Sequence, residues 1–416
     1  MKLSRRINAS ELTLIIQFIL LSTVLTAFTI EGKNILFMGF SVLGAIALLI
    51  LNRKFPVNTS RVIFIMLLLL TVSYLINFKT ADHLSFVYSV FFICSFVIFT
   101  SFFKQKISLE TFRNVAFSVL VLYLIMLIVG QGYVFLGFFK GTYISRGLLH
   151  GPYGTLFEGG LGFRFYSLSS EPSYAAFIVL CLLYVILETD PYQKPFGKKN
   201  LYAWLITVYM LFSFQSGYGV LLFLILILFK TTPRNIFIML TIGLVVVIGA
   251  LIAKQPALTR VVNIISNLRL DQLENIGSID HSASFRILPT YYYLKGIELT
   301  DLHFYFGHGA GQSTKFLVPY LFKVKVESYE GGFLPQFLYD YGIVFGFFFL
   351  LFLKREVLTR FFSFETFVIL LMLTNANFNT QLFWLVITIF ALTKFYKKSS
   401  LYGPPSSLQN LKPATI

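Results

Sequence analysis

Charged side chains are scarce in this sequence: Asp, Glu, Lys and Arg make up only 12% of its 416 residues. An ordinary soluble domain carries about 25% and uses them to cover a surface that faces water. Cysteine is scarcer still, and Cys94 and Cys181 both lie within apolar runs, where a thiol behaves as a small hydrophobic side chain. No group of Cys and His residues has the spacing that is typical of a metal site. These absences exclude a soluble enzyme, a secreted disulfide scaffold and a disordered chain.

Hydrophobic residues take the place of the missing charge. They make up 56% of the chain, aromatic residues make up 18%, and the mean hydropathy is +0.77. A single core cannot bury that many apolar side chains, so lipid must form part of the solvent. Apolar runs near the length that crosses a bilayer predict an all-α polytopic membrane protein with about twelve transmembrane helices. The predicted spans are 11–29, 35–51, 62–77, 86–103, 113–131, 173–188, 201–214, 217–229, 235–253, 333–353, 361–374 and 382–395.

The positions of basic residues indicate how these spans are oriented. If the N-terminus is inside, most Lys and Arg residues fall in the short inner connections, for example at Arg53, Lys104, Lys230 and Lys354. The positive-inside rule then places both termini in the cytoplasm and explains the net charge of +16 without nucleic acid as a partner. The predicted organisation is five spans in 1–131, a first large outer loop at 132–172, four spans in 173–253, a second large outer loop at 254–332, three spans in 333–398 and a cytoplasmic tail at 399–416.

Residues that carry chemistry concentrate on the outer side of this arrangement, which holds all five histidines. The first large loop is rich in glycine and aromatic residues, and irregular backbone of this kind must be buried in protein or line a wet cavity. It contains Arg164 and ends at Glu171-Pro172, which is typical of a helix start. The structural interpretation is a capped sixth span. The functional interpretation adds an anion site that includes Arg164.

The second large loop combines several kinds of polar and aromatic residue. Its glycine-rich stretch, Gly307-His308-Gly309-Ala310-Gly311, allows the backbone to approach a ligand or another helix closely. Guanidinium groups suit a phosphate, carboxylates or an imidazole suit a general base, and aromatic rings suit the faces of sugars. The candidates in this loop are His281, Arg286, Tyr291, His308, Glu327, Tyr329 and Glu330.

Four local features carry a resemblance to a known family. They are Arg164 followed by Ser-Leu-Ser-Ser-Glu-Pro-Ser at 167–173; Ser-x-Ser-x-Arg at 282–286 followed by the Gly-x-Gly-x-Gly of 307–311; a Glu-rich approach to the span that contains Tyr341-Gly342-Ile343; and Asn-x-Asn-x-Asn at 375–379, before Phe383-Trp384. In these features and in its topology the chain resembles the O-antigen and capsule repeat-unit polymerases (Wzy), which are related to the O-antigen ligases.

The resemblance implies a GT-C-like glycosyltransferase at the periplasmic face of the bacterial inner membrane. Such an enzyme joins oligosaccharide repeat units carried on undecaprenyl pyrophosphate into a surface polysaccharide, with inversion and without a metal or other cofactor. Its expected partners are the lipid-linked oligosaccharides and the bilayer, with a chain-length regulator as a further candidate. Arg164 and Arg286, with His281, Tyr291 and Tyr329, are then candidates for binding pyrophosphate and glycan. The general base is one of Glu171, Glu327, Glu330 and His308.

Three alternatives stand beside the polymerase. An O-antigen ligase, which transfers glycan to the lipid A core, carries a His-Asn pair where this chain has Gly331 and Gly332, and this difference favours the polymerase. A flippase for lipid-linked oligosaccharide predicts charged residues in the middle of its spans and short outer loops, unlike those found here. A purely structural membrane protein would not explain the histidines on one side.

Overall fold

A computed structural model describes the main helical parts of the chain. The described residues are 7–22, 29–30, 33–52, 60–136, 165, 167–169, 171–190, 197–230, 266, 281–317, 333–373 and 378–402.

The predicted apolar runs form helices wherever they fall within the described residues. Between α1 and α2, the two-residue strands β1 (Thr29–Ile30) and β2 (Lys33–Asn34) pair in antiparallel fashion. The predicted span 235–253 lies outside the described residues. The helices are α1 (Ala9–Ser22), α2 (Ile35–Leu51), α3 (Arg61–Ile76), α4 (His83–Lys106), α5 (Leu109–Phe135), α6 (Pro172–Glu188), α7 (Lys198–Phe214), α8 (Gly217–Lys230), α12 (His281–Lys295), α13 (Leu302–Phe306), α14 (Ser313–Leu317), α15 (Phe333–Phe352), the π-helix η4 (Leu353–Val357), α16 (Phe364–Met372) and α17 (Gln381–Tyr402).

Among the described residues, three segments are long and apolar enough to cross a membrane: His83–Lys106, Leu109–Gly132 and Gln336–Val357. Several shorter helices, α1 and α3 among them, are equally apolar. Large apolar side chains on the surface, such as Leu43 and Phe64, are more than half exposed, as expected where lipid is the solvent. The expectation of an all-helical fold with apolar helices that suit a membrane is therefore confirmed for the described residues. The twelve spans and the GT-C-like architecture stay predictions.

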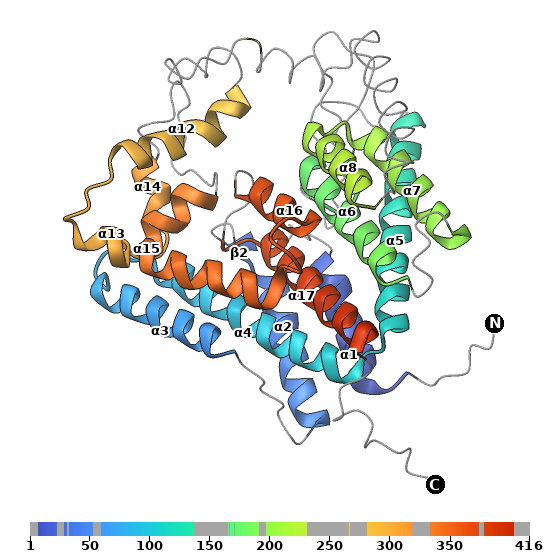
Figure 1. Cartoon of the computed structure of the whole chain (residues 1–416), viewed down its shortest axis with the longest axis horizontal. Helices are drawn as coiled ribbons and strands as arrows, with labels where there is room; N and C mark the ends of the chain where they lie inside the picture. The colour runs from blue at the N-terminus through green and yellow to red at the C-terminus, as the bar shows by residue number, and fades with distance from the viewer. Residues whose placement is uncertain are drawn as a thin grey trace.

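Helix α6 forms the centre of one half of the bundle. Its side chains from Ala175 to Leu187 are buried on every side, because α5, α7, α8 and α17 all pack against it. Figure 1 shows α5 to α8 grouped on one side of α17, and α3, α4 and α15 on the other. A helix that is apolar all round needs such a position.

Helices α7 and α8 are two elements joined by a sharp turn at Gln215, as the two predicted spans 201–214 and 217–229 require. Gln215 ends α7 in the left-handed conformation, with φ of 48°. The rings of Trp204 and Phe223 then meet edge to face at 5.6 Å between centroids, so the two helices fold back on each other.

Ion pairs gather several helix ends at one end of the bundle. Arg113, near the start of α5, lies 3.1 Å from the carboxylate of Asp190, just after α6. Glu188, at the end of α6, pairs with Lys230 of α8 and Lys397 of α17. The basic connections that the sequence places on one side of the membrane thus meet in space, which agrees with antiparallel neighbouring helices.

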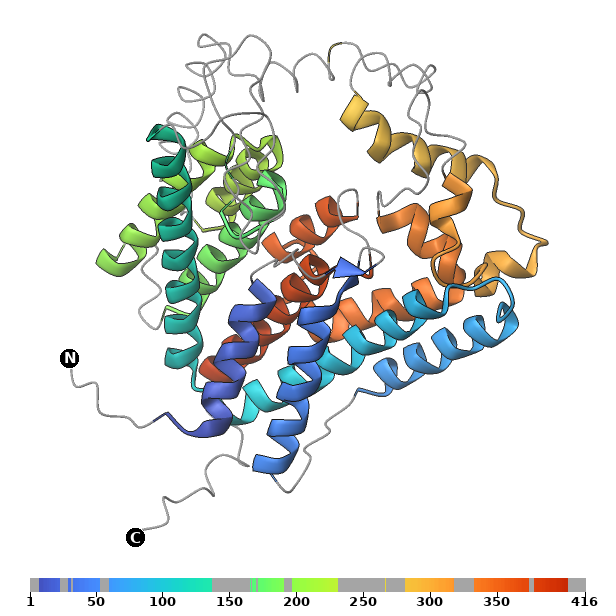
Figure 2. The same cartoon turned by 180° about the vertical axis from the view of Figure 1, so that it is seen from behind.

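The opposite end of the bundle holds α12, α13 and α14. Both views show these three helices at the end of α3 and α15, away from α5 (Figures 1 and 2). All three pack against α15, and α13 also packs against α3. This end of α15 positions the residues described next.

Candidate functional site

A bend in α15 creates the edge on which the site is built. Gly342 has φ of 76° and ψ of 170° within the helix. In an unbroken helix the carbonyls of Tyr339 and Asp340 would accept hydrogen bonds from residues four positions later. At this bend they accept from a different segment: the His308 N–H donates to the Tyr339 carbonyl at 2.8 Å, and the Gly309 N–H donates to the Asp340 carbonyl at 3.0 Å. The carbonyls that the bend frees from the helix therefore bind the backbone of the glycine-rich loop.

Close backbone contact explains why this loop contains glycine. Gly307 and Gly342 both have φ near +77°, a conformation that side chains disfavour. A Cβ on Gly307 would lie 2.2 Å from the Asp340 carbonyl oxygen, and one on Gly342 would lie 2.3 Å from the Tyr305 carbonyl oxygen. The glycine-rich sequence predicts that this backbone approaches either a ligand or another helix closely. In the structure Gly307 approaches the backbone of α15 at Asp340.

The carboxylate of Asp340 fixes the second half of the loop. It is buried, and its two oxygens accept hydrogen bonds from the backbone N–H groups of Gly311 at 3.0 Å and Ser313 at 2.8 Å. A buried carboxylate is costly unless donors of this kind satisfy it. Asp340 is therefore a structural anchor that holds the start of α14 against α15.

The turn between α3 and α4 closes the loop from the other side. Asn77 donates through its side-chain amide to the Gly307 carbonyl at 3.0 Å. The Asp82 N–H donates to the Ala310 carbonyl at 2.9 Å. The backbone of the loop is thus held by hydrogen bonds from two directions, from α15 and from the turn between α3 and α4.

Aromatic rings from three segments form a continuous stack on this support. The His303 and His308 rings lie 4.6 Å apart at 19°, and the His308 and Tyr339 rings lie 4.0 Å apart at 3°. Phe316 of α14 covers the Tyr339 ring at 4.4 Å and 17°. The ring of Tyr293, in α12, meets Tyr339 edge to face at 6.4 Å. The stack therefore joins α12, α13 and α14 to α15.

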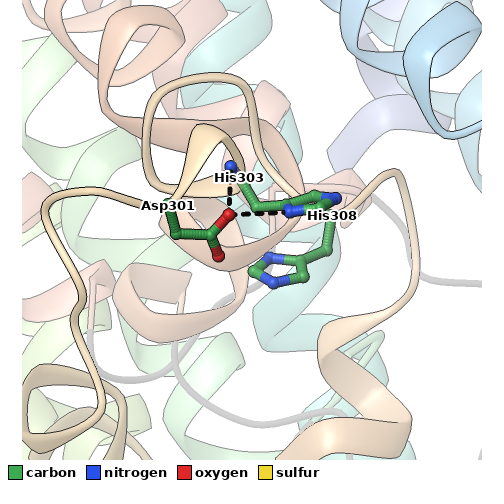
Figure 3. Close-up of side chains that lie close together, drawn as sticks. All are labelled: Asp301, His303 and His308. Carbon is green, nitrogen blue, oxygen red and sulfur yellow. Dashed lines mark hydrogen bonds and ion pairs between the residues drawn. The ribbon is translucent and has the colours of Figure 1, made fainter.

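One end of the stack carries the titratable cluster of Asp301, His303 and His308 (Figure 3). Asp301 precedes α13, and its Oδ1 accepts from both the backbone N–H and the Nδ1 of His303, each at 2.9 Å. The Nδ1 of His308 lies 3.3 Å from the Tyr339 carbonyl oxygen. Carboxylate and carbonyl oxygens only accept hydrogen bonds, so each Nδ1 carries the hydrogen. In the neutral rings the lone pair is then on Nε2.

The environment of the cluster shifts two of its pKa values. The backbone N–H of His303 and then its imidazole lower the pKa of Asp301 below its usual value, so this carboxyl stays ionised. Burial lowers the pKa of His308, and the neighbouring His303 contributes in the same direction. A histidine whose pKa lies below 6.5 is mainly neutral at pH 7. His308 can therefore accept a proton or bind an electrophile through Nε2.

A buried polar network lies beneath this site. The Ser89 hydroxyl lies 2.6 Å from the Tyr341 hydroxyl and donates to the side-chain oxygen of Asn379 at 2.6 Å. Asn379 belongs to the Asn-rich stretch that precedes the last predicted span, and its side-chain amide donates to the hydroxyl of Tyr341, the residue that follows Asp340 in α15, at 3.4 Å. Its contacts are structural.

Two of the predicted site residues lie in the segments that meet at this end of α15. His308 belongs to the cluster, and Tyr291 lies in α12, the helix that reaches the stack through Tyr293. Lys295 lies over the Tyr291 ring at 5.6 Å from its centroid. The backbones of His281 and Arg286 lie in the first turns of α12, and their side chains are outside the described part of the structure. The candidates Arg164, Glu327, Tyr329 and Glu330 lie outside the described residues.

Glu171 occupies a different part of the molecule. It precedes α6, with Pro172 in the first turn as the sequence predicts, and its carboxylate accepts a hydrogen bond from the Ser173 hydroxyl at 3.2 Å. Helix α6 packs against α5, α7, α8 and α17, whereas His308 docks on α15. The role of Glu171 as a general base stays a prediction.

Sequence reasoning did not single out Asp301, His303 or Tyr339. The signal for the first two was present, because an Asp two residues before a His at a helix start both caps the helix and orients the imidazole. The proximity of His303 to His308 depends on the turn at Gly307, which only the fold reveals. Tyr339 lies within an apolar run, and no pattern in the sequence around it indicates a site.

In chemical terms, the site offers two imidazoles with available Nε2 lone pairs beside an ionised carboxylate, on a rigid aromatic support. Comparison of the chain with models of protein families, with curated proteins and with solved structures finds no match in any of the three.

Proposed function

We propose that this protein is a membrane glycosyltransferase that joins lipid-linked oligosaccharide repeat units into a surface polysaccharide. The observation that carries the proposal is the fixed, mainly neutral imidazole of His308 at the end of membrane-crossing helices. The resemblance to the Wzy polymerases supplies the substrate class, undecaprenyl-pyrophosphate-linked oligosaccharides, and the periplasmic face of the bacterial inner membrane.

His308 is the proposed general base. Its Nε2 takes the proton of an acceptor sugar hydroxyl while the hydroxyl oxygen attacks the anomeric carbon of the donor glycan. The bond from that carbon to the pyrophosphate oxygen breaks, and the undecaprenyl pyrophosphate leaves with the electron pair. Attack from the face opposite the leaving group inverts the anomeric carbon.

The other predicted residues have supporting roles in this proposal. The leaving group carries concentrated negative charge, and the guanidinium groups of Arg164 and Arg286 are the candidates that stabilise it. Tyrosine rings such as that of Tyr291 suit the apolar faces of sugars. Pyrophosphate is already a good leaving group, so the proposal needs no metal for this step.

The test uses a strain of the native host from which the gene is deleted, with its surface glycan separated on a gel. Lipid A core that carries a single repeat unit, with the ladder of longer glycans lost, supports the polymerase. Core without any repeat unit, with polymer left on undecaprenyl pyrophosphate, would indicate a ligase. Complete absence of exported repeat units would indicate a flippase.

A further inference from the structure

We propose that Asp301, His303 and His308 form a binding site for a divalent transition metal ion of the Zn²⁺ type. One ligand atom of each side chain lies within 4.8 Å of those of the other two. Among the described residues of this chain, no other group of three or more His, Cys, Asp and Glu side chains has this geometry. The inference does not depend on the proposed glycosyl transfer.

The donor set suits this class of metal. Two imidazoles and one carboxylate are the protein ligands of many zinc sites that leave a further position open for water or another ligand. Borderline ions such as Zn²⁺ prefer imidazole nitrogen, whereas Mg²⁺ and Ca²⁺ prefer sites made of oxygen alone. Asp301 contributes one negative charge, so the loaded site keeps a single net positive charge on the metal.

Hydrogen bonds set the tautomer of both imidazoles so that each Nε2 carries the lone pair. A histidine that binds a metal through one ring nitrogen usually donates its other N–H to a carboxylate or a backbone carbonyl. Here His303 donates through Nδ1 to Asp301, and His308 donates through Nδ1 to the Tyr339 carbonyl. Both Nε2 atoms are left for the metal. Figure 3 shows the second carboxylate oxygen of Asp301 on the side of the His308 ring, without a bond to His303.

The two rings differ in how freely they can adjust. His308 is held on both sides by rings and at its backbone by α15, so its Nε2 is a fixed point. The His303 side chain is 42% exposed and lies at the outer end of the stack. Since two parallel rings cannot both aim their lone pairs at one ion, metal binding turns the His303 ring out of the stack. The site therefore closes by the movement of one exposed side chain.

The test measures Zn²⁺ binding to the full-length chain, purified in detergent without a polyhistidine tag, by isothermal titration calorimetry. The variants are Asp301→Asn, which retains a residue that caps a helix, and His303→Gln and His308→Gln, which retain polar side chains. The matched control is His83→Gln, because His83 lies at the same end of the bundle and bonds Tyr74 rather than the cluster. Thermal unfolding of each variant confirms that it is folded.

One Zn²⁺ per wild-type chain is expected, with the same affinity in His83→Gln. Each of the three cluster variants is expected to bind more than about 100-fold more weakly, which exceeds the effect of losing a residue that only orients a ligand. With Co²⁺ as the probe, an absorption band of a low-symmetry site should appear in the wild type and not in His308→Gln. Absence of stoichiometric binding, or binding that survives in His303→Gln and His308→Gln, would overturn the proposal.

Discussion

Gly342 and Gly307 lie with their backbones in direct contact, and a Cβ on Gly342 would lie 2.5 Å from the nitrogen of Gly307. Gly342 bends α15, and Gly307 ends α13. Because neither residue has a side chain, the two backbones can approach this closely. The position of His308, the residue after Gly307, follows from this contact. The arrangement explains how the glycine-rich loop is held at the bend of α15.

Gly342→Ala is expected to destabilise the protein. A side chain in this backbone conformation, with φ of 76° and ψ of 170°, costs about 1–3 kcal/mol, and the contact with the Tyr305 carbonyl adds to it. Thermal unfolding in detergent should show a lower midpoint. The control is Gly132→Ala in α5, where a Cβ meets nothing within 4 Å and the substitution should have little effect or be stabilising. Equal midpoints for the two variants would contradict the contact.

Replacement of the buried carboxylate in Asp340→Asn should loosen the glycine-rich loop. One of the backbone N–H groups of Gly311 and Ser313 then faces an amide NH₂ instead of an oxygen, at a cost of about 1–3 kcal/mol. Glu298→Gln, at an exposed carboxylate in the preceding turn, should change the unfolding midpoint little. Hydrogen exchange should also become faster at residues 307–313 in Asp340→Asn alone.

The aromatic stack is expected to respond to the shape of residue 339 rather than to its hydroxyl. Tyr339→Phe retains the rings that contact His308 and Phe316, and it should preserve stability. Tyr339→Ala removes both contacts, each worth about 0.5–1.5 kcal/mol beyond the area that it buries. Comparison of the two unfolding midpoints checks this. A Phe variant as unstable as the Ala variant would show that the hydroxyl, and not the ring, is essential.

The helices of this protein could be predicted from its sequence because lipid imposes a simple requirement. A membrane helix must be apolar over a fixed length, and the runs that form α4, α5 and α15 satisfy this without reference to any other part of the chain. Local charge also predicts on which side of the membrane the connections lie, and this orientation stays a prediction. The helix ends that carry Arg113 and Lys230 do lie at the same end of the bundle.

The site could be predicted only in part. His308 was identifiable because an imidazole suits a general base and the sequence places it in a predicted outer loop. Other parts of the site depend on where the loop docks. At the bend in α15 the loop N–H groups replace the helix's own donors to the carbonyls, and the turn at Gly307 brings His303 onto His308. Local composition does not encode such contacts, because each depends on where a distant segment docks.

Removal of the proposed base should abolish polymer formation while leaving the protein intact. In the deletion strain, His308→Gln is expected to leave the single-repeat product unchanged and not to restore the ladder, because loss of a general base slows transfer by about 10²–10⁴-fold. His83→Gln should restore the full ladder. A complete ladder with His308→Gln, at a normal level of the protein in the membrane, would exclude His308 as the base.

Zn²⁺ is expected to inhibit polymerisation by the purified protein, since ligation occupies the Nε2 lone pair that proton transfer requires. The rate should fall as the metal site fills and recover when EDTA removes the ion. His83→Gln should be inhibited like the wild type. An unchanged rate at a Zn²⁺ concentration that saturates the site would show that His308 does not serve both purposes.

The most direct measurement incubates the purified protein in lipid vesicles with undecaprenyl-pyrophosphate-linked repeat units from its native host and follows the products by mass spectrometry. Lipid-linked glycans of two or more repeats should form, with one undecaprenyl pyrophosphate released for each new linkage, and His308→Gln should form almost none. Unchanged substrate with folded wild-type protein, or transfer only after lipid A core is added, would contradict the proposed polymerase function.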